Sequence, residues 1–314
     1  MTELYSVLRN WEENGNNPII SPPFPSPLIA DPTFSPPKKR GDIWHLFAHS
    51  VMPNTSLFNI LHYVSHDGFN WKRVPGIVMR SALRPYLFFE KEQIFLLYER
   101  IVRFLPFYFS QIEVITSFDF YHWTRPVTIL TPSLDWHKYN DKALTVSNPC
   151  LIKEKDVYRL YYSAGLVYLK DCRFYEPLYI GCAISKNILT PFSPSDAPVI
   201  SPNFDDRWLN LGAGSMKVIK IKDEFFGFQN GIYWNFESNH SGSAIRVWVS
   251  LDGYDWRLLS NDPIIKPEGN GWKRTHVYAN DVREVDGNYV MYFNARSGWL
   301  FGRERIGRAD SINF

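Results

Sequence analysis

A proline-led phrase that recurs five times along the 314 residues constrains the fold more than any other feature of the chain. In each copy a proline is followed by β-branched or apolar residues, and successive prolines are 51 to 72 residues apart. The copies lie at residues 17–20, 74–78, 125–129, 197–200 and 262–265. A period of this size is typical of repeated supersecondary units, each of which buries its hydrophobic face against a neighbour.

A second phrase indicates where strands within each repeat are joined. A serine, an aspartate two positions later, several turn residues and a tryptophan recur at residues 65–71, 117–123 and 250–256. Two of these copies contain Asp-Gly, which is a tight-turn signal between strands. We therefore expect each tryptophan to begin a new strand and to pack between neighbouring units.

A third phrase follows the proline repeat and consists of a strand, a polar turn and a strongly aromatic strand. Examples lie at residues 86–98, 150–162 and 282–293. Aromatic residues make up 17% of the chain, and their rings pack well on pleated surfaces. Each repeat therefore contains about four short strands, which is the size of a propeller blade.

Together these repeats predict an all-β fold, a single five-bladed β-propeller domain over residues 1–314. The first proline phrase has no unit before it, so we expect it to supply the outer strand of the last blade. An N-terminal strand added there would close the ring and remove exposed sheet edges. A β-sandwich also has evenly spaced strands, but a five-fold repeat with an N-terminal remnant favours the propeller.

Charge and composition exclude several classes of partner. The chain has 34 basic and 32 acidic residues, a net charge of +2 and no long run of one sign, so no nucleic acid is expected. The apolar phrase at residues 101–109 is short and is broken by Arg103 and Pro106, so no membrane partner is expected. The first residues lack a basic region followed by an apolar run, which predicts a soluble, cytoplasmic protein.

Cysteines and histidines do not have the spacing of metal ligands. The three cysteines form neither a CxxC pair nor a disulfide framework, and the histidines are scattered. We therefore expect no catalytic metal and no cofactor.

In a propeller the innermost strands surround a central axis, so polar residues at the starts of these strands should converge. The five starts carry Asp31, Arg84, Asn148, Ser215 and Asp281. The second strand of each blade is antiparallel to the first, so its end lies beside that start. Those ends carry His49, Glu99, Ser163, Asn230 and Arg296. A mouth so rich in hydrogen-bonding side chains suits a hydroxyl-rich small molecule or an oligosaccharide.

One of these starts resembles a known motif. Ala30-Asp31-Pro32-Thr33-Phe34 is similar to the blade-one motif of the five-bladed propeller glycosidase superfamily. That superfamily includes arabinanases and xylosidases, invertases and levansucrases, and mannoside phosphorylases. The resemblance implies that Asp31 is a general base in an inverting enzyme or a nucleophile in a retaining one.

The chain also departs from the superfamily's pattern. Arabinanase-like members carry a second aspartate at the start of blade three, where this chain has Asn148, and a glutamate at blade four, where residues 211–215 contain no acid. Arg84-Pro85 lacks the aspartate of the invertase-like motif. Asp31 is therefore the one catalytic residue that the resemblance implies directly. The identity of the general acid stays open.

Glycoside hydrolysis needs two carboxyl groups, one of which donates a proton. For that acid, the expected geometry allows Glu99 and Asp281. Arg84, Arg296 and His276 are candidate cations, which a phosphorylase would need to hold phosphate. Three further residues are candidates for sugar stacking: Trp234, Trp272 and Trp299.

The leading hypothesis is therefore a carbohydrate-active enzyme, a glycoside hydrolase with Asp31 as base or nucleophile. A glycoside phosphorylase or a transglycosylase remains an alternative within this class. A non-catalytic carbohydrate-binding propeller is a second alternative, because the expected acid is missing. A propeller that binds protein partners is a third, although the dense polar mouth argues against it.

Overall fold

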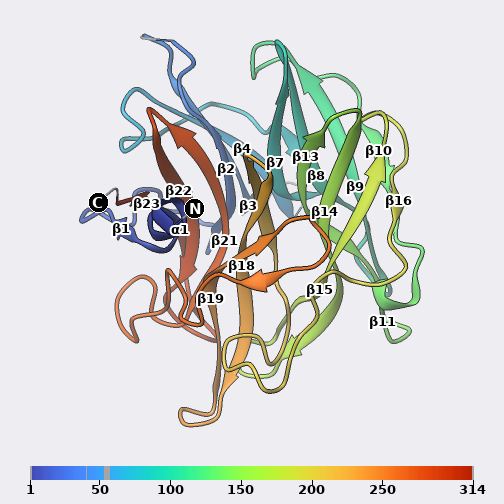
Figure 1. The fold of residues 1–314 in the computed structure, drawn as a ribbon, viewed down its shortest axis with the longest axis vertical. Helices are drawn as coiled ribbons and strands as arrows, with labels where there is room; N and C mark the ends of the chain where they lie inside the picture. Colours follow the sequence, from blue (N-terminus) through green and yellow to red (C-terminus); the bar gives the residue numbers. More distant parts are fainter. Residues whose placement is uncertain (1, 40, 53–56, 313–314) are drawn as a thin grey trace.

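The computed structural model describes residues 2–39, 41–52 and 57–312, and nearly all of its regular structure is β. Figure 1 shows strands grouped into sheets around the middle of the molecule, with one short helix, α1 (Thr2–Arg9), at the edge. No helix in the described ranges is long and apolar enough to cross a membrane.

Within the described residues the strands form four sheets, and consecutive strands make up three of them. One sheet has the order β2 (Ile29–Ser35), β3 (Trp44–Val51), β4 (Phe58–Ser65) and β5 (Lys72–Arg73), with β6 (Met79–Arg80) also paired to β4. Another has the order β13 (Val146–Glu154), β14 (Val157–Leu169), β15 (Phe174–Ser185) and β16 (Ser193–Pro194).

The third of these sheets is larger because short strands extend it. Its main run is β7 (Ala82–Glu90), β8 (Gln93–Arg103) and β9 (Tyr108–Ser117), with β10 (Val127–Leu130) paired to β9. After the 3-10 turn η1 (Asp135–His137), the short strands β11 (Lys138–Tyr139) and β12 (Ala143–Leu144) pair with each other, and β12 also pairs with β9.

The eight-stranded sheet consists of two antiparallel runs. One is β17 (Met216–Ile221), β18 (Glu224–Asn235), β19 (His240–Ser250) and β20 (Arg257–Leu258). The other is β21 (His276–Val285), β22 (Asn288–Arg296), β23 (Glu304–Ser311) and β1 (Trp11–Glu13). The runs meet at a single parallel pair, Ser243 with His276. In Figure 1 both ends of the chain lie on the side where β1 is paired with β23.

The three strand–turn–strand phrases in the sequence correspond to β7–β8, β13–β14 and β21–β22, so these predicted strands are confirmed. Alternate residues of each strand pack against different neighbouring sheets, which divides the hydrophobic core into clusters between sheets. One cluster joins the last sheet to the first: the Phe34 ring of β2 lies 4.6 Å from the Tyr292 ring of β22.

The prediction that the repeated tryptophans pack between neighbouring units is also confirmed. Each contacts an aromatic ring on a different sheet or antiparallel run. Ring centroids are 5.6 to 5.8 Å apart in the pairs Trp71–Tyr292, Trp123–Phe47 and Trp256–Tyr161. These edge-to-face contacts add to the stability gained by burying the rings.

The Ser-x-Asp turn before each tryptophan is held by the aspartate side chain. In the first copy, Oδ1 of Asp67 accepts hydrogen bonds from the backbone N–H groups of Phe69 and Asn70, both at 2.8 Å, and from the Ser65 hydroxyl at 2.9 Å. These bonds, led by the Asn70 amide, hold the pKa of Asp67 below its ordinary value. A fourth turn of this kind, at residues 185–190, uses Asn187 in place of aspartate and was not recognised from the sequence.

We expect Asp67→Ala to lower the free energy of unfolding by about 1 kcal/mol at pH 7, because three hydrogen bonds to one oxygen are lost in an exposed turn. The folded-state pKa of Asp67 is depressed, so this stabilisation is complete above the unfolded pKa and is lost progressively as the pH falls from there through the folded-state pKa, which leaves only part of it lost at pH 3. Urea unfolding at pH 7 and pH 3 measures both effects. His66→Ala, in the same turn, is the control, and an equal loss in both variants would contradict this account.

Candidate functional site

The innermost strands begin with a local distortion that turns polar side chains toward the middle of the molecule. Asp31, Arg84 and Asn148 all have left-handed backbone conformations, with φ of 51°, 53° and 49°. Each is followed by proline, and the strand register shifts across each pair. Gly214, just before β17, has φ of 61°. A bulge of this kind re-aims a side chain that a regular strand would direct into the sheet packing.

In β21 the corresponding register shift lies between Val277 and Asn280, so its bulged residues are Tyr278 and Ala279. The second of these two residues lies two positions before Asp281, the residue that the sequence analysis predicts at the start of this strand. No proline marks the bulge here, and no residue of it has positive φ.

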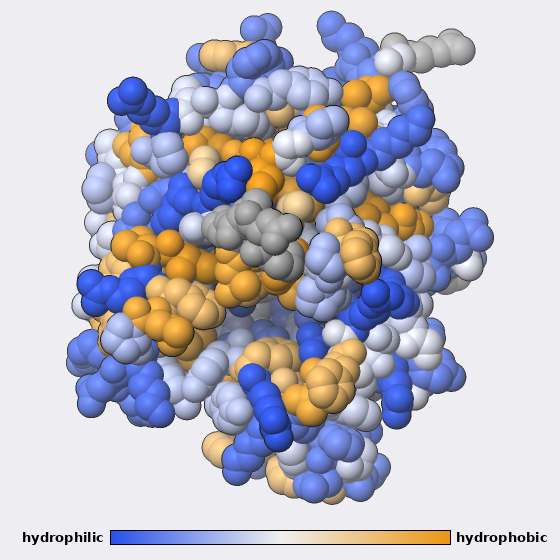
Figure 2. All heavy atoms as spheres, turned by 180° about the vertical axis from the view of Figure 1, so that it is seen from behind, coloured by the Kyte–Doolittle hydropathy of each residue, from blue (hydrophilic) through white to orange (hydrophobic). Residues whose placement is uncertain are grey.

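A cavity of about 270 Å³ lies where these bulges meet. Its polar lining comes from first, second and third strands and the residues beside them: Asp31, His49, Arg84, Asn148, Glu176, Ser215, Asn230, Tyr278, Asn294, Arg296 and Glu304. Leu28, Phe58, Leu83, Phe174, Tyr175 and Pro177 supply apolar surface. Figure 2 shows a hollow in one face of the molecule with a hydrophilic interior and hydrophobic residues along its edges.

Asp31 is held at the cavity by two neighbouring sheets. Its backbone N–H donates to Oδ1 of Asn294 at 3.1 Å, and its Oδ2 lies 3.2 Å from Nδ1 of His49. Burial lowers the pKa of His49 to about 4, although the Asp31 charge acts in the opposite direction. At neutral pH His49 is therefore uncharged, and its Nδ1 also accepts a long hydrogen bond of 3.5 Å from the backbone N–H of Arg84.

Two arginines line the cavity, and each is paired with a glutamate. Arg84 Nη1 lies 2.5 Å from Oε2 of Glu99, whose Oε1 accepts a 2.7 Å hydrogen bond from the Tyr108 hydroxyl. Arg296 Nη1 lies 2.9 Å from Oε1 of Glu304. Burial alone would lower the pKa of each arginine, but the adjacent glutamates raise both values. The positive charges are therefore permanent and largely neutralised.

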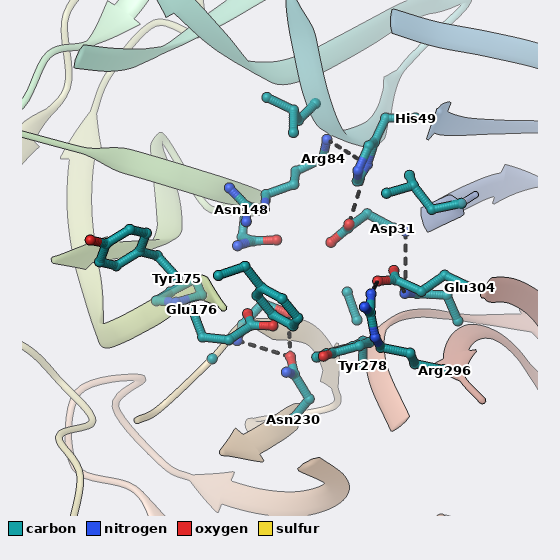
Figure 3. A pocket seen from close by; sticks show the side chains of 18 of the residues that line it. Asp31, His49, Arg84, Asn148, Tyr175, Glu176, Asn230, Tyr278, Arg296 and Glu304 are labelled. Atoms are coloured by element: carbon teal, nitrogen blue, oxygen red, sulfur yellow. Dashed lines mark hydrogen bonds and ion pairs between the residues drawn. The ribbon is translucent and has the colours of Figure 1, made fainter. Parts of the chain in front are cut away.

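Glu176 differs from Glu99 and Glu304 because, in the part of the chain that the structure describes, no arginine forms an ion pair with it. Burial raises the pKa of Glu176 to about 8, the Arg84 charge opposes this shift, and Glu304 and Asp31 add to it. Glu176 is therefore protonated at neutral pH and can donate a proton. Figure 3 shows the side chains of Asp31, Asn148 and Glu176 pointing toward the same space.

Two buried polar atoms at the cavity have no partner among the described residues that meets strict hydrogen-bond geometry. These are Oδ1 of Asn148 and the hydroxyl of Tyr278, in residues that are 3% and 6% exposed. The Tyr278 hydroxyl is nevertheless close enough to Glu176 to lower the pKa of that carboxyl as a weak donor, against the larger effect of burial. Unpaired buried polar groups are costly, so these two atoms are suited to hydrogen bonds with a bound ligand.

Seven of the eleven residues proposed from the sequence line this cavity: Asp31, His49, Arg84, Asn148, Ser215, Asn230 and Arg296. The other four lie outside its lining. Glu99 is fully buried behind Arg84. The Ser163 hydroxyl donates to the backbone oxygen of Gly214 at 2.7 Å and is fully buried.

Asp281 and His276 belong to other buried networks. Oδ2 of Asp281 accepts hydrogen bonds from the Thr33 hydroxyl at 2.8 Å and the Phe34 amide at 3.0 Å, and it pairs with Arg283. His276 contacts the hydroxyls of Thr275 and Ser241, and burial lowers its pKa to about 3. His276 is therefore neutral rather than a cation. Trp234, Trp272 and Trp299 also lie outside the cavity lining.

Glu176 and Glu304 were missed in the sequence because only the first and second strands were considered. Each lies near the start of a third strand, opposite the end of the second: Glu176 is paired with Val167 in β15–β14, and Glu304 with Arg296 in β23–β22. The third strand is antiparallel to the second, so its start lies beside the end of the second strand. Applying this to the third strands would have placed both glutamates at the mouth of the cavity.

No group of three or more His, Cys, Asp or Glu side chains in the described ranges is arranged to hold a metal ion.

Comparisons with known proteins identify relatives by structure, while no family model and no curated protein matches the sequence. The catalytic domain of the Coprinopsis cinerea GH62 alpha-L-arabinofuranosidase aligns with a TM-score of 0.69 and 15% identity over 97% of both chains. An N-acetylgalactosamine deacetylase from F. plautii, in complex with blood group B trisaccharide, has a TM-score of 0.65 and 14% identity over 90% of this chain and 89% of its own.

A GH130 structure, from work on mannoside phosphorylases and glycoside hydrolases that target β-1,2 mannosidic linkages in Candida mannan, also has a TM-score of 0.65. It is 14% identical over 95% of this chain and 93% of its own. At these identities the likeness shows the fold alone, which is that of the propeller glycoside hydrolases. The resemblance expected from the sequence is confirmed at this level.

We expect Glu176→Gln to stabilise the protein in a pH-dependent way. The folded-state pKa of about 8 exceeds the ordinary value of 4.5, so the stability contributed by protonated Glu176 is complete below pH 4.5 and is lost as the pH rises through 8. Glutamine cannot ionise, so the variant gains on the order of 3 kcal/mol relative to wild type between pH 4 and pH 8.5.

Denaturant unfolding across this pH range measures the gain. Glu304→Gln is the contrasting variant: it leaves Arg296 without its carboxylate partner, so it should destabilise the protein. A difference between Glu176→Gln and wild type that stays constant with pH would contradict the assignment of a raised pKa.

Proposed function

We propose that this protein is a glycoside hydrolase in which Asp31 is the general base or nucleophile and Glu176 is the general acid. The observation that carries the proposal is the pairing, in one cavity, of the Asp31 carboxylate with a buried Glu176 whose pKa is raised to about 8. Glycosidic bond cleavage requires such a division between an ionised and a protonated carboxyl group.

The proposed steps use only these two groups and water. The Glu176 carboxyl donates its proton to the glycosidic oxygen as the bond to the anomeric carbon breaks, and the leaving group departs with a new hydroxyl. Asp31 either attacks the anomeric carbon directly or removes a proton from the attacking water. In the first case water later hydrolyses the glycosyl ester, and Glu176, now ionised, accepts its proton.

The remaining cavity residues fit the recognition of one sugar ring. A volume of about 270 Å³ is small for a ligand site, so the cavity encloses a single ring better than a chain. Oδ1 of Asn148 accepts from a sugar hydroxyl, and the Tyr278 hydroxyl donates to one or accepts from one. His49 contacts Asp31 and acts as a positioning residue for its carboxylate.

Hydrolysis is favoured over phosphorolysis because both arginines of the cavity are already paired with glutamates. Arg84 and Arg296 each have a glutamate partner, so neither offers an unneutralised charge to inorganic phosphate. The cavity residues that have unpaired atoms are neutral, which suits uncharged sugar hydroxyls.

We also infer that the chain forms a single five-bladed propeller over residues 1–314. The three consecutive-strand sheets would be three blades, and the two antiparallel runs of the eight-stranded sheet would be the other two. The pairing of β1 with β23 supports closure of the ring by the N-terminal segment, as does the contact between Phe34 and Tyr292.

We expect a panel of 4-nitrophenyl glycosides to reveal a hydrolysed substrate, and Asp31→Asn to lower kcat/KM for it by about 10³-fold or more. The exposed Glu237, on the β18–β19 hairpin, provides the control Glu237→Gln, which should retain wild-type activity. Activity that survives Asp31→Asn unchanged would contradict the assignment. Sugar binding without hydrolysis in wild type would instead favour a carbohydrate-binding propeller.

The pH profile tests the role of Glu176. Wild-type kcat/KM should fall as the pH rises through about 8, because the acid loses its proton. Glu176→Gln should lose about 10² to 10⁴-fold on a methyl glycoside, whose leaving group needs protonation, and much less on a glycosyl fluoride, whose leaving group does not. Equal losses on both substrates, or an unchanged alkaline limb, would exclude Glu176 as the acid.

A further inference from the structure

A cluster of three tyrosines lies beside the cavity, two of them on the sheet that carries Glu176 and the third on the sheet that contains β7 to β9. Tyr175 lines the cavity and is the residue immediately before Glu176 in β15. Tyr168 of β14 is its cross-strand partner, with ring centroids 5.0 Å apart, and Tyr139 of β11 packs edge-on at 5.2 Å. These three residues form what we call the tyrosine shelf.

The shelf is exposed although its rings contact one another. Tyr168 is 41% exposed and Tyr175 is 42% exposed, whereas Glu176, the next residue in β15, is buried. Figure 3 shows Tyr175 pointing away from the middle of the cavity, while Glu176 points into it. The shelf therefore continues the cavity wall outward, over the sheet formed by β13 to β16.

The position of the acid determines which part of a substrate would meet this shelf. A general acid must reach the glycosidic oxygen, which belongs to the leaving group once the bond breaks. If Glu176 is that acid, the leaving group lies on its side of the cavity mouth. Tyr175 is the exposed aromatic residue that joins Glu176 to the surface on this side.

We propose that the tyrosine shelf is a leaving-group subsite that binds a second sugar ring, so that the substrate is a di- or oligosaccharide with its terminal residue enclosed in the cavity. The proposal rests on the proposed function, because it takes the direction of the leaving group from Glu176. Tyrosine combines a flat apolar face with a hydroxyl, which matches the alternating apolar faces and polar edges of a sugar ring.

A sugar ring fits the shelf better than an alkyl group does. The most exposed aliphatic side chains near this end of the sheets are Val102 and Leu105, 55% and 76% exposed, on the β8–β9 hairpin. They do not line the cavity.

The test compares a disaccharide with a glycosyl fluoride of the same terminal sugar, because fluoride has no ring to occupy the subsite. Tyr175→Ala should raise KM for the disaccharide about tenfold, equivalent to about 1.4 kcal/mol, and should lower kcat/KM for the fluoride much less. Tyr168→Ala should show a smaller effect of the same kind. Tyr175→Phe keeps the ring and should remain within about twofold of wild type.

Tyr121→Ala is the matched control. Tyr121 is 50% exposed and lies in the Ser-x-Asp turn after β9, whose last residue Ser117 pairs with Ile94 at the end of β8 farthest from Glu99. For Tyr121→Ala, KM for the disaccharide and kcat/KM for the fluoride should both equal the wild-type values. Equal losses of Tyr175→Ala on the disaccharide and the fluoride, or no loss on either, would overturn the subsite.

A binding measurement separates this proposal from the proposed reaction. An array of immobilised di- and oligosaccharides, probed with wild type and with Tyr175→Ala, needs no turnover. Oligosaccharide binding that Tyr175→Ala weakens, in a protein that hydrolyses nothing, would support the shelf and overturn the reaction. Hydrolysis by wild type, with array binding unaffected by Tyr175→Ala, would overturn the shelf alone. Absence of both binding and hydrolysis would overturn both proposals.

Discussion

The site depends on a backbone constraint at the start of the innermost strands. Asp31, Arg84 and Asn148 adopt positive φ, a conformation that costs an L-residue roughly 1 kcal/mol or more because its Cβ crowds the backbone. In return, the bulge releases each side chain from the alternating pattern of the strand. Without it, these three residues would pack between sheets, and the cavity would lose the Asp31 carboxylate and two further polar side chains of its lining.

Burial then gives different roles to chemically similar groups. Glu99 and Glu304 are buried next to arginines that pair with them, although burial still raises the pKa of Glu304 because the Arg296 charge offsets it only in part. Glu176 is buried without such an ion pair, so desolvation dominates and its pKa rises to about 8. Asp31 contacts a neutral histidine and remains accessible to the cavity. One small space thus contains a proton donor, a carboxylate and two neutralised arginines.

Much of the fold followed from the sequence because its signals are local. Proline phrases, Ser-x-Asp turns and aromatic strands are chemical properties of short segments, and they located β7, β8, β13, β14, β21 and β22. Asp31 was found because a proline marks its bulge. Asp281 was placed two residues from the true bulge of β21 because Ala279 stands where the other bulges have proline. Glu176 was missed because only the first and second strands of each repeat were followed, whereas Glu176 lies near the start of a third strand, opposite the end of the second.

The central claim is that Asp31 and Glu176 act on opposite sides of one glycosidic bond. A crystal structure of Glu176→Gln with a bound oligosaccharide tests it most directly. The account predicts the terminal ring inside the cavity, its anomeric carbon facing Asp31 and its glycosidic oxygen within hydrogen-bonding distance of residue 176, with hydroxyls on Asn148 and Tyr278. A sugar bound elsewhere on the molecule, or one whose anomeric carbon faces away from Asp31, would contradict it.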